Sequence, residues 1–136
     1  MKWVPLYLLT ALVTGLHNFY GLMGMVNGAA PSLLNYVSLV GSAMLLGTAI
    51  FRPFRWHGAL KVGFAGSVVC QVFYAPQAFI CLVAPSSAWW AIQFDLSHRE
   101  YVPLVGMLLG PVLLVLCTGN SILQLRRNRA ASRIVA

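Results

Sequence analysis

Four long apolar runs, separated by short polar breaks, constrain this chain more than any other feature. They cover residues 3–25, 33–51, 59–84 and 102–124, each bound being approximate. A membrane-spanning helix needs about 20 consecutive apolar residues, so each run is long enough to cross a bilayer once. Only 8% of the residues are charged, against roughly 25% in a soluble domain. We therefore expect an all-α membrane protein, a four-transmembrane-helix bundle, in which residues 1–136 form a single integral membrane domain.

The positive charges predict how these four spans are oriented. With four spans, the two chain ends and the second connection lie on one side of the membrane, and they hold eight of the nine Lys and Arg residues: Lys2, Arg52, Arg55, Lys61, Arg126, Arg127, Arg129 and Arg133. The other side holds Arg99, together with the two acids Asp95 and Glu100. Because loops rich in Lys and Arg stay in the cytoplasm, we expect the N and C termini to be cytoplasmic, in a bacterial inner (plasma) membrane. We expect the basic tail to contact anionic lipid headgroups rather than nucleic acid.

Small and polar residues recur at helical spacing in each run and form one stripe per helix. In a bilayer, small residues let helices approach closely and polar side chains hydrogen-bond across the interface. These stripes therefore predict the faces that pack inside the bundle. The predicted helix-packing residues are Thr14, His17, Gly21, Gly24, Gly63, Ser67, Gly106 and Gly110, and the predicted interior polar residues are Asn35, Tyr74, Gln77 and Asn120.

His17 is the one histidine within a run, and an unpaired imidazole in the bilayer core is costly. We expect it to be neutral and to hydrogen-bond to another helix, with Asn35, Tyr74 or Gln77 as its partner. The alternative is a cofactor role, in which His17 ligates haem or chlorophyll. Haem of the b type usually takes two axial ligands, and His57 and His98 both lie outside the runs. We therefore expect no cofactor, and we keep His17 as the candidate ligand if one is present.

Other chemistry finds little support in the sequence. No run contains Asp or Glu, and transporters coupled to ions usually need a membrane carboxylate. Residues 84–101 hold Asp95 and His98 at a spacing that one face of a helix could share, as a metal or acid–base pair. We favour an aromatic belt at the outer interface with solvated charges, because no third ligand or nucleophile accompanies the pair. We expect Cys70, Cys81 and Cys117 to be free thiols, no metal site and no enzymatic activity.

The segments VTGLHNFYGL and GSAMLLGTAIFRPFRWHGALK resemble DoxX-like small membrane proteins, which also have four spans. The positions that carry the resemblance are Gly15, Gly41, Gly47 and Arg52. Asn18 stands where that family usually has a lysine, and the second run lacks a glutamate. DoxX-like proteins are associated with membrane redox complexes. The resemblance therefore implies a small partner subunit in such a complex and assigns no catalytic residue.

Three functional hypotheses follow. The first is a non-catalytic accessory or structural subunit of a larger membrane complex, which the resemblance to DoxX-like proteins implies is redox-linked. Its partners are other membrane protein subunits and the lipid bilayer. The second is a small homo-oligomeric channel or transporter built around the polar stripes. The third is a haem- or pigment-binding subunit that uses His17. The sequence names neither a partner nor a substrate.

Overall fold

The computed structural model describes residues 3–23, 32–54 and 58–135, with side chains as far as residue 130. The described residues form helices and no strand, in the order α1 (Val4–Leu22), α2 (Leu33–Phe51), α3 (Ala59–Val83), α4 (Pro85–Ser97) and α5 (Tyr101–Val135). The all-helical prediction is therefore confirmed for this part of the chain. Gly24, one of the predicted packing residues, lies outside the described residues.

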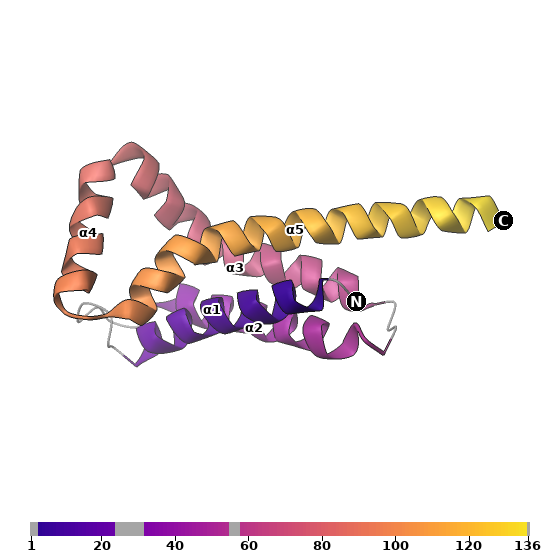
Figure 1. Cartoon of the computed structure of the whole chain (residues 1–136), viewed down its shortest axis with the longest axis horizontal. Coiled ribbons are helices and arrows are strands. Elements are labelled where there is room, and N and C mark those ends of the chain that lie inside the picture. The colour runs from indigo at the N-terminus through magenta and orange to yellow at the C-terminus, as the bar shows by residue number, and fades with distance from the viewer. Residues whose placement is uncertain (1–2, 24–31, 55–57, 136) are drawn as a thin grey trace.

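Prolines mark several of the helix boundaries. Pro5 and Pro85 lie in the first turns of α1 and α4, where the missing backbone N–H is not needed for an intrahelical bond. Pro85 also follows the end of α3, so it separates α3 from α4. Pro76 lies inside α3, and the part of α3 beyond it bends away from α1 and α2 (Figure 1).

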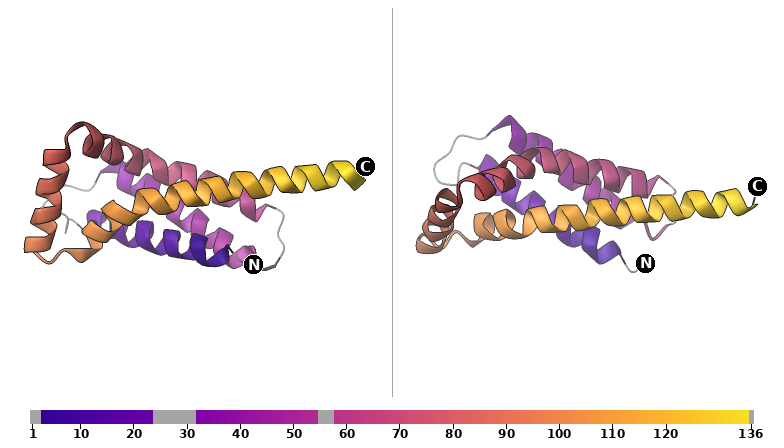
Figure 2. Two further views of the ribbon diagram at one scale, coloured as in Figure 1. Left: turned by 45° about the horizontal axis from the view of Figure 1, so that its top comes forward. Right: turned by 90° about the horizontal axis from the view of Figure 1, so that it is seen from above.

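Four of the five helices pack side by side in a ring. The ring follows the order α1, α2, α3, α5 and back to α1, since each of these neighbouring pairs is in contact. Helix α4 runs across one end of the ring and contacts α3 and α5 (Figures 1 and 2). The start of α1 and the end of α5 both point to the opposite end, as Figure 2 shows from two directions.

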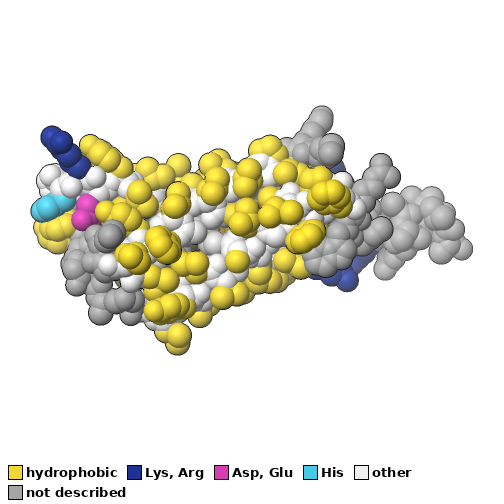
Figure 3. Space-filling view, turned by 90° about the horizontal axis from the view of Figure 1, so that it is seen from below, with side chains coloured by type: hydrophobic (Ala, Val, Ile, Leu, Met, Phe, Trp, Pro, Cys, Tyr) yellow, Lys and Arg dark blue, Asp and Glu magenta, His cyan; other side chains and the backbone are white. Residues whose placement is uncertain are grey.

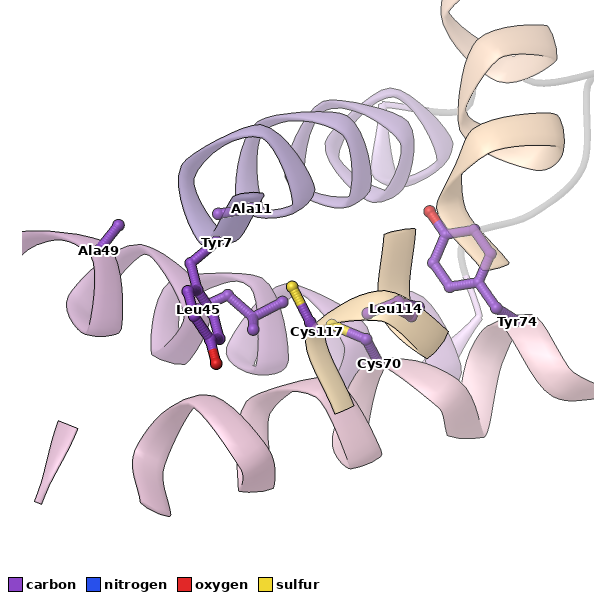
Figure 4. Packing of buried hydrophobic residues seen from close by; sticks show 8 residues of the cluster. All are labelled: Tyr7, Ala11, Leu45, Ala49, Cys70, Tyr74, Leu114 and Cys117. Atoms are coloured by element: carbon purple, nitrogen blue, oxygen red, sulfur yellow. The ribbon is translucent and has the colours of Figure 1, made fainter. Parts of the chain in front are cut away.

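The core combines apolar side chains with small and neutral polar ones. Figure 4 shows the apolar cluster, to which all four helices of the ring contribute: Tyr7, Ala11, Leu45, Ala49, Cys70, Tyr74, Leu114 and Cys117. Thr10, Thr14, Asn18 and Ser38 are buried beside it. The stripes of small and polar residues therefore face the inside of the ring.

The surface between the two ends of the molecule is apolar. Large hydrophobic side chains such as Leu16, Phe19 and Val115 are more than half exposed, and Figure 3 shows yellow side chains along the middle of one face, with the coloured charged groups at the ends. Among the described residues, three helices are long and apolar enough to cross a membrane: α2, α3 and the Tyr101–Ala130 part of α5. Helix α1 has 19 residues but is not among them, because His17 and Asn18 lower its mean hydropathy. The structure therefore supports a membrane protein with three candidate spans among the described residues.

Two helices extend beyond what the apolar runs predict. Residues 85–97, which the sequence analysis treats as an interfacial loop, form α4. Helix α5 has 35 residues, and at 1.5 Å per residue it measures about 52 Å, well beyond the roughly 30 Å of a bilayer core. The basic tail thus continues the last helix, since Leu, Gln, Arg and Ala favour helix.

Candidate functional site

His17 and Tyr74 form a hydrogen bond across the diagonal of the ring. His17 Nδ1 and the Tyr74 hydroxyl lie 2.8 Å apart, and the two residues are 6% and 1% exposed. The Phe73 ring meets the imidazole edge-on, with centroids 5.7 Å apart. A histidine and a tyrosine are long enough to meet between α1 and α3, which lie opposite each other in the ring. Tyr74 is one of the three partners that the sequence suggests for His17.

Two glycines of α5 leave the space that this pair occupies. A Cβ added to Gly106 would collide with the His17 ring, and one added to Gly110 would lie 2.5 Å from Tyr74 Cε1. Both contacts are shorter than van der Waals distance, so any side chain at either position would displace the pair. The G-M-L-L-G segment of α5 therefore fits the polar centre of the bundle rather than a neighbouring chain.

The remaining described packing and interior residues are placed at several points of the bundle. Thr14 Oγ1 lies 2.7 Å from Ser42 Oγ, and a Cβ on Gly63 would meet Thr48 and Tyr7. Ser67 Oγ accepts a hydrogen bond from Thr118 at 2.9 Å, and Asn120 Nδ2 donates to the Tyr7 hydroxyl at 3.0 Å. Asn35 accepts a hydrogen bond from Ser32 near the start of α2 and makes none with His17. Gly21 is buried on α1.

A cavity of about 250 Å³ opens beside His17, between α1, α3, α4 and α5. We call it the α4 cavity. It lies at the end of the ring that α4 crosses, and its walls mix apolar side chains with a few polar ones. Its lining residues are His17, Gln77, Ile80, Cys81, Ser87, Ala88, Ala91, Asp95, Pro103 and Met107.

Two residues that line this cavity each hold a buried hydrogen-bond acceptor without a partner in the described part of the chain. Asp95 Oδ1 and Gln77 Oε1 are both buried and make no hydrogen bond within the described part of the chain. Asp95 is 4% exposed. Buried polar groups are normally paired, and an isolated buried carboxylate is especially costly. The two atoms therefore mark a place where the protein alone does not satisfy its own polar groups.

The electrostatic surroundings of Asp95 favour its neutral form. Burial raises the pKa of this carboxyl, the nearby Glu100 raises it further, and His98 opposes the shift. The Glu100 backbone N–H donates to the Asp95 carbonyl at 2.8 Å, which fixes the short connection from α4 to α5. Arg99, in that connection, has a φ of 59°, and its side chain is exposed.

The structure corrects the expectation of solvated charges for Asp95, which is buried, whereas the Arg99 side chain is exposed as expected. Asp95 points into the molecule, whereas His98 is exposed and stacks on Phe94 with centroids 4.0 Å apart. Asp95 and His98 therefore do not form the metal or acid–base pair that their spacing allows. Trp89 and Trp90 are 60% and 62% exposed, as aromatic side chains at a membrane interface would be. Among the described residues, no group of three His, Cys, Asp or Glu residues is placed to hold a metal ion.

Sequence reasoning missed the α4 cavity because it treated residues 84–101 as a loop. The signal is nevertheless present in the chain. Ala88, Ala91 and Asp95 follow one another at spacings of three and four residues, so in a helix they share one face. Two small residues followed by an acid at that spacing indicate a face that packs closely at one end and carries a carboxylate inward at the other.

No family model, curated protein or solved structure matches this chain. The resemblance to DoxX-like proteins therefore stays a prediction, and the functional argument rests on the site itself.

Proposed function

We propose that this chain is a four-span membrane protein that binds a small ligand in the α4 cavity and catalyses no reaction on it. The observation that carries the proposal is that two lining residues, Asp95 and Gln77, each hold a buried side-chain oxygen without a hydrogen-bond partner in the described part of the chain. A concave, largely apolar pocket with a few convergent polar groups is the usual form of a small-molecule site. A ligand with hydrogen-bond donors supplies what both atoms lack.

The packing of α1 supports the fourth span. Helix α1 lies in the ring between α2 and α5, and its polar residues Thr14, His17 and Asn18 face inward and are buried. Leu8, Leu12 and Leu16 on its other side are exposed, as a lipid-facing surface would be. With four spans, the charge bias assigns both termini to the cytoplasm, and the α4 cavity then lies at the outer end of the bundle.

The geometry argues against the channel and cofactor hypotheses and is compatible with an accessory-subunit role. The polar stripes lie inside each chain, so they are not available to line a pore between copies, which argues against a channel built around them. The cavity beside His17 is about 250 Å³, smaller than the pockets of about 300–1,000 Å³ that enclose drug-sized ligands, so it does not enclose a haem or a chlorophyll. The residues present therefore do not fit a tetrapyrrole. An accessory-subunit role is compatible with ligand binding, and the mass of the native complex in mild detergent tests it.

Thermal unfolding of the purified full-length protein tests ligand binding. The probes are ethylammonium chloride, sodium propionate and propionamide at equal ionic strength, which differ in charge but not greatly in size. A ligand at 100 times its Kd stabilises the folded state by about 2.7 kcal/mol, so we expect at least one probe to raise the unfolding temperature.

Two variants that replace an alanine with phenylalanine test whether the stabilisation comes from binding in the α4 cavity. Ala91→Phe fills the cavity, and we expect it to abolish the shift, whereas Ala75→Phe adds the same ring on an exposed face of α3 and should retain it. If Ala91→Phe itself lowers the unfolding temperature, Ala88→Val provides a smaller filling residue. The proposal is wrong if no probe stabilises the wild type, or if the stabilisation persists in the filled variants.

A further inference from the structure

The walls of the α4 cavity carry one acidic side chain, Asp95, without a Lys or Arg beside it. No Lys or Arg is among the lining residues, and Asp95 makes no salt bridge within the part of the chain that the structure describes. Arg99, the nearest basic residue in the sequence, has an exposed side chain. The unpartnered atoms of Asp95 and Gln77 are both acceptors. The polar part of this site thus complements a donor that carries positive charge.

Other parts of the cavity limit the size and shape of that donor. The volume of the cavity is about 250 Å³, which is the volume that roughly eight water molecules occupy in liquid water, at about 30 Å³ each. Ile80, Pro103 and Met107 provide apolar walls beside the acceptors. A metal ion fits poorly, because no three candidate ligands are grouped in the described chain and much of the wall could not coordinate it.

We propose that the ligand of the α4 cavity is a small organic cation, an alkylammonium whose N–H groups donate to the side-chain oxygens of Asp95 and Gln77, two lining residues, and whose short alkyl part packs against the apolar wall. This inference rests on the proposed ligand-binding function and specifies the chemical class. Burial and the neighbouring Glu100 make the ionised form of Asp95 unfavourable and so raise its pKa. A bound cation offsets both effects. Binding and ionisation of Asp95 therefore favour each other.

The chain carries its own reporter for this site. Cys81 lines the cavity and is partly exposed, whereas Cys70 and Cys117 are buried. Two methanethiosulfonate reagents of similar size, one bearing a trimethylammonium group and one a sulfonate, modify thiols and differ in charge. Comparing their rates at Cys81 measures the local preference for cations. Cys81→Ser identifies the signal that comes from the other two thiols.

The measured quantity is the rate of the cationic reagent at Cys81 divided by the rate of the anionic one, corrected by the same ratio for a free thiol in solution. We expect this corrected ratio to be at least about ten. Clefts lined by one sign of charge raise the local concentration of counter-ions by about 10–1,000-fold. Asp95→Asn should bring the corrected ratio close to one. Glu100→Gln removes the same charge outside the cavity lining and should leave most of the preference. Ethylammonium should slow the modification of Cys81, while propionate and propionamide should not.

Several results would overturn the inference, and they are distinguishable from a failure of the proposed function. A corrected ratio near one in the wild type, or an equal loss in Asp95→Asn and Glu100→Gln, shows that the cavity has no charge preference of its own. Protection of Cys81 by propionate or propionamide as strong as by ethylammonium leaves ligand binding intact and rejects the cation. If none of the three probes protects Cys81 and none stabilises the protein, the ligand-binding function itself is rejected.

Discussion

The His17–Tyr74 hydrogen bond joins opposite helices at 2.8 Å, and its energetic weight can be measured. Interhelical hydrogen bonds in a bilayer average about 0.6 kcal/mol and reach about 1.7 kcal/mol, because the unfolded chain in the membrane also finds partners. We expect Tyr74→Phe to lower the free energy of unfolding within that range, as measured by denaturation in detergent. Tyr36→Phe, at an exposed position of α2, is the control and should change little. A loss of several kcal/mol would mean that Tyr74 does more than bond to His17.

The absorbance spectrum addresses the cofactor hypothesis for His17 directly. We expect the wild type and His17→Gln, purified in parallel, to show the same visible spectrum without a Soret or chlorophyll band. Glutamine keeps a hydrogen-bonding group at this position, so the variant should remain assembled with at most a mild loss of thermal stability. A band present in the wild type and absent from His17→Gln would make His17 a cofactor ligand and would contradict the hydrogen-bonding role.

Asp95 should make the stability of the protein depend on pH in an unusual direction. Because burial and then Glu100 raise the pKa of this carboxyl, the folded state keeps its proton above the ordinary aspartate range of about 3.9. Between the two values the folded state binds more protons than the unfolded chain, so stability falls as the pH rises through that window.

Asp95→Asn should remove this contribution. We expect the unfolding temperature of the variant, relative to the wild type, to increase as the pH rises through the window, in thermal unfolding without added amine. A difference that instead grows toward acid pH would show that the folded state stabilises the Asp95 carboxylate.

Close packing of α5 against the His17–Tyr74 pair predicts a contrast between two glycines of the same helix. A Cβ at Gly106 would collide with the His17 ring, whereas one at Gly119 meets no heavy atom within 4 Å. We expect Gly106→Ala to lower the free energy of unfolding by about 1–3 kcal/mol, the usual cost of overpacking. Gly119→Ala should be neutral or stabilising by up to about 1 kcal/mol, since alanine favours helix. Equal effects at the two positions would mean that the Gly106 face of α5 does not contact α1.

Helical periodicity explains why the buried faces of the long helices could be predicted from the sequence. In lipid, a face that carries Thr14 and His17 must turn inward, because the bilayer provides no hydrogen bonds. The same argument does not select Tyr74 over Gln77 as the partner of His17, since that choice depends on the relative depth and rotation of α1 and α3. Nor could it show that Asp95 is buried, because the burial of one residue of α4 depends on where α3 and α5 place that helix.

The whole molecule separates its charged groups along its length. Asp95 lies in α4, and Arg99 and Glu100 lie in the connection from α4 to α5. Figure 3 shows Lys and Arg side chains at both ends of the molecule and the acidic side chains at one end. The apolar surface lies between them. In the proposed four-span topology, the α4 cavity lies on the side of the membrane that holds both acids.

That orientation is the prediction for the molecule as a whole. The eight Lys and Arg residues on one side against Arg99 on the other are a strong bias, and Lys and Arg close to the spans set the orientation. We expect a tag after Ala136 to be accessible only from the cytoplasm, and Cys81 to react with impermeant cationic reagent only from outside. Replacing the four arginines of the tail with glutamine leaves four basic residues against one, so the orientation should be retained. A tag accessible from outside, or cross-links between Lys61 of one copy and Arg99 of another, would show that the charge bias does not set the orientation.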